Sequence, residues 1–258
     1  MDLSAAIKRT TDYAKRHGGL LTLEELKKRL ISEVVYEDKE IEREARGIGK
    51  FPEKIPRTGN KKMRKAQVLV KKHLARFGDI LMVGVTGSVA AGYPDRNDDI
   101  DLLVVTRRKR LWLTRLVLRI YVRLKGIPHR SYLREEKKDQ FCFNLWLTEE
   151  SLGIPIERQG LSAAVDLVMM RVLLNRDHTY EKMIVANHWA KKYVATGYKR
   201  LNQRFGLRQG FDGQTKRFGR NNWLGNLLNW LVFWPQYWYM RGKIRNEIID
   251  MDRAFFNH

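Results

Sequence analysis

The chain has 258 residues, enough for one domain of good size or two small ones, and its 43% of hydrophobic residues excludes global disorder. Its formal net charge of +21 predicts a polyanionic partner such as nucleic acid, nucleotide phosphates or an anionic membrane surface, although a generally basic proteome would give the same excess. Cys142 is the single cysteine, which excludes a disulfide within the chain, and the first residues lack the apolar core of a signal peptide. We therefore expect a cytoplasmic protein.

Residues 1–50 are predicted to form short helices. A capping box begins at Thr22, whose side chain can accept from the backbone N–H of Glu25 while Glu25 reaches back to Thr22. An apolar stripe with helical spacing follows, formed by Leu23, Leu26, Leu30 and Ile31. A second, polar helix is predicted over residues 39–46. Two helices of this kind fit either a helix-turn-helix or a packing accessory.

Proline, glycine and asparagine stand among charged residues over residues 48–62, which predicts a domain boundary there. A basic amphipathic helix is expected over about residues 62–77. Its apolar face comprises Met63, Ala66, Val70, Leu74 and Phe77. After Gly78 and Asp79, the nearly continuous apolar run of residues 80–86 predicts a buried strand.

A Gly-Ser turn and a pair of aspartates follow this strand. Gly87 and Ser88 allow close backbone approach to a ligand and offer N–H and hydroxyl groups to phosphates. The next predicted strand, residues 100–106, is entered at Asp99, and because residues two apart on a strand share a face, Asp99 and Asp101 project together while Ile100 faces the core. Two adjacent carboxylates with phosphates nearby suit Mg²⁺. The motif therefore predicts a site for a divalent cation and a phosphorylated ligand.

The remaining elements predict a small α/β domain over residues 62–150, followed by a helical C-terminal domain over residues 151–258. Leu113, Leu116, Val117, Ile120 and Leu124 mark an amphipathic helix. Its row Arg115, Arg119 and Arg123 could follow phosphates, but a solvated helix face is the commoner explanation. Residues 140–147 are a third strand candidate. Helices are expected over residues 161–174 and 180–194.

Residues 221–240 carry no charge and four tryptophans. Trp223, Trp230, Trp234 and Trp238 fall on one side of a helix, and Asn222, Asn226, Asn229 and Gln236 fall on the other. With Lys and Arg on both flanks, this pattern is typical of an interfacial membrane helix. The four amides and Pro235 disfavour a transmembrane span. A helix packed on the core or on a protein partner is the favoured interpretation.

The run GSVAAGYPDRNDDIDLLVV, residues 87–105, resembles the DNA polymerase β-like nucleotidyltransferase superfamily, whose signature is Gly-Ser, ten residues, then Asp-hydrophobic-Asp-hydrophobic. A weaker likeness to an uncharacterised bacterial and archaeal branch, in which a winged-helix-like segment precedes the transferase core, extends over Leu111-Trp112-Leu113-Thr114, Phe141-Cys142-Phe143-Asn144 and Gln236-Tyr237-Trp238-Tyr239-Met240. The resemblance implies that Gly87 and Ser88 hold the β- and γ-phosphates of a nucleoside triphosphate. It also implies that Asp99 and Asp101 hold Mg²⁺ or Mn²⁺, and that a nucleoside monophosphate passes to a hydroxyl acceptor with loss of pyrophosphate.

The sequence departs from the family at its third carboxylate, which normally ligates a second metal ion and helps to activate the attacking hydroxyl. Asn144 stands at that position, and an amide can lend a carbonyl oxygen to a metal but cannot act as a base. Asp139 is expected on the opposite strand face, whereas Glu149 or Glu150 could reach in from a loop. Two hypotheses follow: an active nucleotidyltransferase, or a degenerate module that binds a nucleotide or nucleic acid through the same fold.

Overall fold

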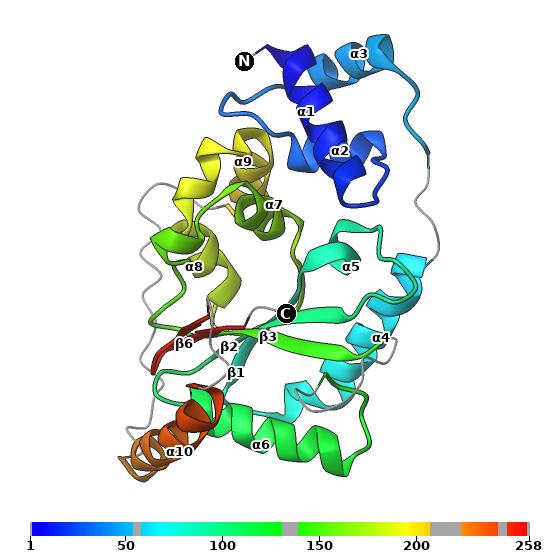
Figure 1. The fold of residues 1–258 in the computed structure, drawn as a ribbon. Helices are drawn as coiled ribbons and strands as arrows, with labels where there is room; N and C mark the ends of the chain where they lie inside the picture. Colours follow the sequence, from blue (N-terminus) through cyan, green and yellow to red (C-terminus); the bar gives the residue numbers. More distant parts are fainter. Residues whose placement is uncertain (1, 54–57, 131–138, 207–222, 242–246, 257–258) are drawn as a thin grey trace.

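The computed structural model describes residues 2–53, 58–130, 139–206, 223–241 and 247–256, which form an α/β protein around one six-stranded, mixed, open sheet (Figure 1). The strand order is β4-β1-β2-β3-β6-β5. β2 and β3 pair in parallel, and every other neighbouring pair in this sheet is antiparallel. The strands are β1 Ile80–Val85, β2 Ile100–Thr106, β3 Phe141–Thr148, β4 Arg171–Asn175, β5 Ile248–Ile249 and β6 Arg253–Phe255.

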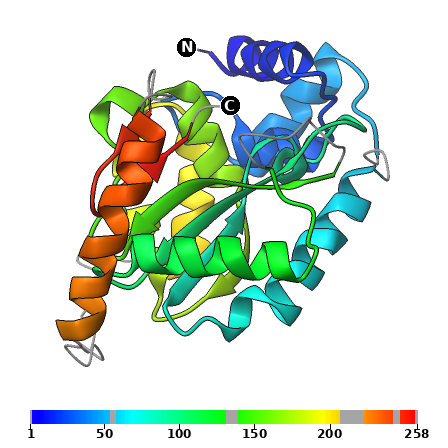
Figure 2. The ribbon, with the colours of Figure 1, turned by 60° about the horizontal axis from the view of Figure 1, so that its bottom comes forward.

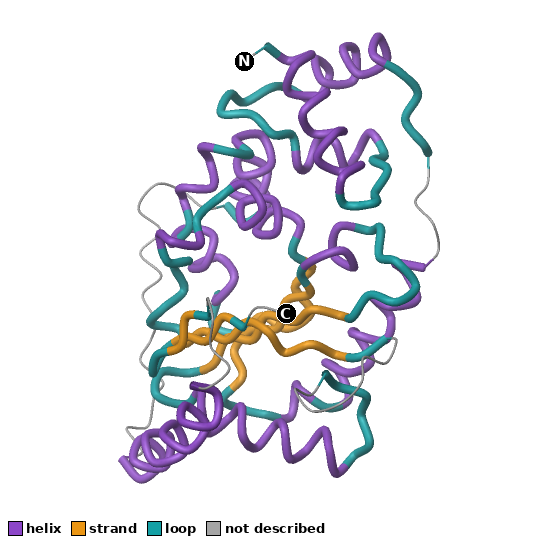
Figure 3. The backbone as a smooth tube through the Cα atoms, viewed as in Figure 1, coloured by secondary structure: helices purple, strands orange, loops and turns teal. Residues whose placement is uncertain are grey.

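Helices cover both faces of this sheet (Figures 1 and 3). One face packs on α4 (Thr58–Lys72), α6 (Leu111–Leu124) and α10 (Trp223–Arg241). The other packs on α7 (Leu161–Met169), α8 (Thr179–Ala186) and α9 (Ala195–Arg204). Along β2, Ile100, Leu102 and Val104 enter the first core, and Leu103 and Val105 enter the second. The alternation of a strand thus places Asp101 on the face covered by α7.

The N-terminal helices α1 (Leu3–Arg16), α2 (Leu23–Arg29) and α3 (Asp38–Ile48) have a core of their own, built around Ile7, Leu26, Leu30 and Ile41. The predicted capping box at Thr22 is confirmed at the start of α2. Outside these helices, the described residues 2–53 contribute one isolated bridge, between Ser32 and Val194, and no β-hairpin of the kind that forms a wing. These helices therefore dock beside α9 through main-chain contacts.

The three predicted strands are confirmed as β1, β2 and β3, and the basic helix begins at Thr58, before the predicted residue 62. The expectation of a helix over residues 161–174 is wrong beyond Met169, because Arg171–Asn175 pairs with β1 as β4. The apolar run Val172-Leu173-Leu174 suits a helix or a strand equally, and the unpaired edge of β1 decides between them. β5 and β6 also extend the sheet, so the C-terminal part is not entirely helical.

α6 and α10 lie against each other at one edge of the molecule (Figure 2). The expectation that Arg115 belongs to a solvated row is wrong, because its side chain is buried and donates to Gln236 Oε1 over 2.6 Å. Burial lowers the pKa of Arg115 to about 9. No helix in the described ranges is long and apolar enough to cross a membrane.

Candidate active site

The turn between β1 and α5 (Gly87–Ala91) brings the backbone against the aspartate pair. Gly87 has φ +64°, and a Cβ atom at this position would lie 2.7 Å from Asp101 Oδ2. Both the left-handed conformation and this close approach require glycine. The predicted neighbourhood of the Gly-Ser turn and Asp101 is therefore present.

The two aspartates differ in their partners. Asp99 Oδ2 lies 3.3 Å from Arg130 NH1, and Asp99 Oδ1 accepts from the backbone N–H of Gln140. Asp101 is more deeply placed, and burial together with the charges of Asp99 and Asp166 raises its pKa to about 6. Asp101 is thus a half-buried carboxylate among like charges, an arrangement that a bound cation would relieve.

Asn144 shares this site with Asp101. Its Nδ2 donates to Asp101 Oδ1 over 3.1 Å, while its Oδ1 is buried with no partner in the described structure. Buried acceptors are rarely left unsatisfied in proteins, so this oxygen marks a place for a donor or a cation. Cys142 pairs with Asp101 across β2 and β3, and burial raises the pKa of its thiol. It is therefore not a nucleophile at neutral pH.

The alternative carboxylates on and after the third strand lie elsewhere. Asp139 pairs with Lys62 and Lys65, as expected for a side chain directed away from the aspartate pair. Glu149 accepts from the backbone N–H of Arg108 over 3.0 Å, and Glu150 pairs with the same arginine. The expectation that either glutamate could reach the site is not met, because both are held by the loop after β2.

Asp166 is the site residue that the sequence reasoning missed. It lies on α7, which packs against α5, the helix that begins at Gly87. Burial raises its pKa to about 6, and its charge in turn acts on Asp101. The available signal was a single carboxylate inside the otherwise uncharged helix LSAAVDLVM. A third carboxylate therefore adjoins the pair, from a helix and not from a strand.

One of the groups predicted to bind phosphates has a protein partner in this structure. Ser88 Oγ donates to Asp98 Oδ2 over 2.6 Å. Phosphate binding by Gly87 and Ser88 stays a prediction, and it requires a triphosphate to displace the Asp98 carboxylate from Ser88.

Two buried cations hold the loop that carries these residues. Lys62 of α4 donates to the backbone oxygens of Arg96 and Asp98. Arg29 of α2 donates to Ala91 O over 2.9 Å and lies over the ring of Tyr93. The N-terminal helices and α4 thus fix the segment between the Gly-Ser turn and Asp99.

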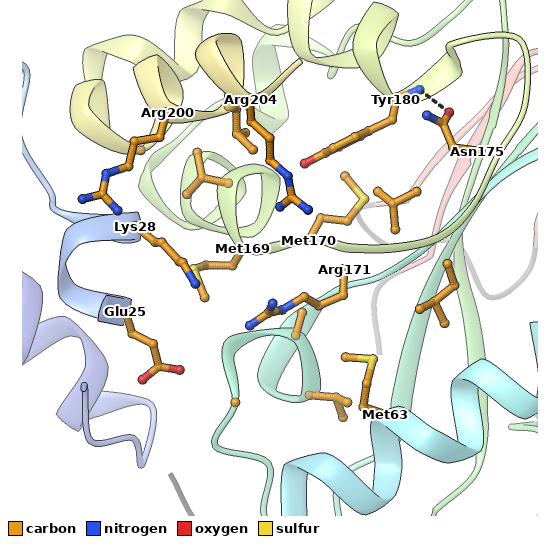
Figure 4. Close-up of a pocket in the computed structure, with 18 of the residues that line it drawn as sticks. Glu25, Lys28, Met63, Met169, Met170, Arg171, Asn175, Tyr180, Arg200 and Arg204 are labelled. Carbon is orange, nitrogen blue, oxygen red and sulfur yellow. Dashed lines mark hydrogen bonds between the residues drawn. The ribbon is translucent and has the colours of Figure 1, made fainter. Parts of the chain in front are cut away.

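A cavity of about 930 Å³ adjoins α5, α2, α7 and α9 (Figure 4). Arg171 and Arg204 direct their guanidinium groups into it, and Lys28 its ammonium group. No carboxylate in the described ranges forms an ion pair with any of these three cations. Arg171 pairs with Val85, two residues before Gly87, so the cavity begins beside the Gly-Ser turn. None of the predicted site residues lines it.

Within the described ranges, no three His, Cys, Asp or Glu side chains are arranged to hold a metal ion as they stand. The donor set nevertheless fits Mg²⁺, because it consists of two carboxylates and the unsatisfied amide oxygen of Asn144. The structure thus brings Gly87, Ser88, Asp99, Asp101 and Asn144 into one region, as the sequence predicts.

Comparisons of the chain with protein-family models, curated proteins and solved structures found no match.

Proposed function

We propose that the protein is a nucleotidyltransferase that moves a nucleoside monophosphate from a nucleoside triphosphate to a hydroxyl acceptor. The observation that supports this most is the half-buried carboxylate pair Asp99 and Asp101, of which Asp101 lies against the Gly87 backbone, beside the unsatisfied oxygen of Asn144. A partly desolvated anionic pair of this kind costs stability, so its presence suggests a cationic ligand. The resemblance of residues 87–105 to the polymerase β-like superfamily points to the same reaction.

Asp99 and Asp101 would hold Mg²⁺ with the Asn144 carbonyl oxygen, and Gly87 and Ser88 would receive the β- and γ-phosphates. The bound ion would supply charge stabilisation for the entering and leaving oxygens. The acceptor oxygen forms a bond to the α-phosphorus while the bond to the pyrophosphate oxygen breaks. Arg171, beside the turn, is placed to attract the anionic substrate.

We assign the role of the third carboxylate to Asp166. It adjoins Asp101 closely enough to raise its pKa, and its own pKa of about 6 lies near neutrality, where a general base works best. Asp166 would take the proton of the acceptor hydroxyl. This assignment explains how Asn144 can replace an aspartate without loss of the reaction.

The test is incubation with each α-labelled nucleoside triphosphate, Mg²⁺ or Mn²⁺ and a cell extract. We expect labelled acceptor from the wild-type protein, a loss of about 10²-fold or more in Asp166→Asn, and no change in the control Glu149→Gln. Full activity in Asp166→Asn with a gain in Asn144→Asp would place the third carboxylate on the strand instead. Absence of label with all nucleotides would exclude the enzyme.

The second candidate is a catalytically degenerate module that binds a nucleotide or nucleic acid. The basic cavity of Lys28, Arg171 and Arg204 favours it, because three cations that form no ion pair with a carboxylate of the described residues suit a phosphate backbone as well as a substrate. The two functions differ in one result: both bind a polyanion, and only the first transfers label.

A further inference from the structure

Helix α10 has two faces of opposite character, and the polar one is turned inward. Asn229 Oδ1 accepts from the backbone N–H groups of Trp112 and Leu113, over 2.9 and 3.0 Å, and so caps the start of α6. Asn226 accepts from Arg110, and Gln236 bonds with Arg115. The amides that would oppose a buried apolar helix are therefore the groups that attach α10 to α6.

The outward face is apolar over nearly the whole helix. Trp223 and Trp238 are 71% and 58% exposed, near its two ends. Further large side chains, each at least two fifths exposed, lie between and beside them: Leu224, Leu227, Leu228, Trp230, Leu231, Trp234 and Tyr239. No described residue accepts a hydrogen bond from the indole N–H of Trp223, Trp230, Trp234 or Trp238. Such a continuous exposed patch marks an interaction surface.

Positively charged residues flank α10 in the sequence, and their charge favours an anionic partner. From Gly213 to Asn246 the chain has six Lys or Arg and no Asp or Glu. Arg241, the last residue of α10, lies over the ring of Trp238 at 4.9 Å. Between two copies of this segment, which has no carboxylate, these cations would lack a counter-charge, whereas anionic lipid headgroups would supply one. Tryptophans whose indole N–H groups have no acceptor among the described residues are also suited to the headgroup level of a bilayer.

We propose that α10 binds the surface of an anionic membrane, with its tryptophan face at the headgroup boundary and its axis in the plane of the bilayer. Figure 2 shows α10 along one edge of the molecule, where its outward face can meet a flat surface. The helix remains attached to the protein by its amide face, so binding requires no unfolding. This proposal is independent of nucleotidyl transfer.

The experiment is flotation with vesicles of phosphatidylcholine alone, and of phosphatidylcholine and phosphatidylserine in equal parts. We expect binding to the mixed vesicles, weaker binding to the neutral ones, and a loss of about tenfold or more in the double variant Trp223→Ser/Trp238→Ser. The matched control, Leu20→Ser/Ile156→Ser, removes two equally exposed apolar side chains elsewhere and should bind as the wild type does.

Three results would overturn the proposal. One is the absence of wild-type binding to the mixed vesicles. Another is equal binding by the tryptophan variant, which would assign the interaction to charge alone. The third is a concentration-dependent dimer in analytical ultracentrifugation that the tryptophan variant abolishes, without vesicle binding, which would identify a second copy as the partner.

Discussion

At the scale of single residues, the ionised carboxylate of Asp101 has an electrostatic cost in the folded protein. This half-buried carboxylate lies near the charges of Asp99 and Asp166, faces the Gly87 backbone, and receives a hydrogen bond from Asn144. This neutral donor does not compensate for a partly desolvated negative charge among like charges. The cost persists in the metal-free protein, as is typical of sites that are organised for a ligand.

This cost predicts a pH-dependent gain in stability for Asp101→Asn. The folded state raises the pKa of Asp101 from 3.8 to about 6, so it favours the protonated form. The associated stability is present below about pH 4 and is lost as the pH rises through 6. In chelator at pH 8, Asp101→Asn should therefore unfold with a free energy higher by about 2 kcal/mol, with little difference at pH 4. Urea unfolding at both pH values measures this, and a less stable variant at pH 8 would refute the assignment.

At the scale of elements, apolar runs of strand length predicted β1 and β2, and helical periodicity predicted most helices. The short apolar run of β4 directly follows the apolar helix α7, so it was included in the helix predicted over residues 161–174. The sequence pattern also did not show which face of α10 is buried. Asn229 is buried only because it meets the start of α6, 117 residues away in sequence. In the candidate site, spacing brought Gly87, Asp99 and Asp101 together, but Asp166 comes from a distant helix that no local pattern connects to them.

The attachment of α10 gives a prediction for Asn229→Ala. Residue Arg110, at the start of α6, has no side-chain cap hydrogen bond, and Asn229 supplies this cap from a different helix. Its loss should leave two buried N–H groups unsatisfied and lower the free energy of unfolding by about 1–2 kcal/mol. Asn226→Ala removes one half-buried hydrogen bond from the Arg110 side chain on the same face and leaves both N–H groups capped, so it should cost less than Asn229→Ala. Equal losses in urea unfolding would contradict the capping role.

At the scale of the whole molecule, the sheet joins segments from most of the chain, and the N-terminal helices rest on the loop of the candidate site through Arg29. The cavity beside that loop gathers cations from α2, β4 and α9. The net charge of +21 was visible in the sequence, whereas this convergence depends on how separate elements pack. The cavity is therefore one specific place where part of the excess positive charge is concentrated.

We predict that single-stranded RNA binds at this cavity, and the salt dependence of its affinity tests this. Affinity should fall linearly with the logarithm of salt concentration, since each neutralised phosphate releases counterions. Replacing Lys28, Arg171 and Arg204 with alanine should reduce the magnitude of that slope by about 2. Replacing the exposed Lys8, Arg9 and Arg16 of α1 removes equal charge outside the cavity and should change it less. Equal effects in filter binding would mean that the cavity is not the binding surface.

The most direct test of the proposed site is calorimetric titration with each nucleoside triphosphate, with Mg²⁺ and with chelator. The wild-type protein should bind at least one nucleotide only when Mg²⁺ is present. Asp99→Asn/Asp101→Asn should remove this binding while the protein stays folded by circular dichroism, and the matched double variant Glu149→Gln/Glu150→Gln should retain it. Unchanged nucleotide affinity in Asp99→Asn/Asp101→Asn would contradict the site.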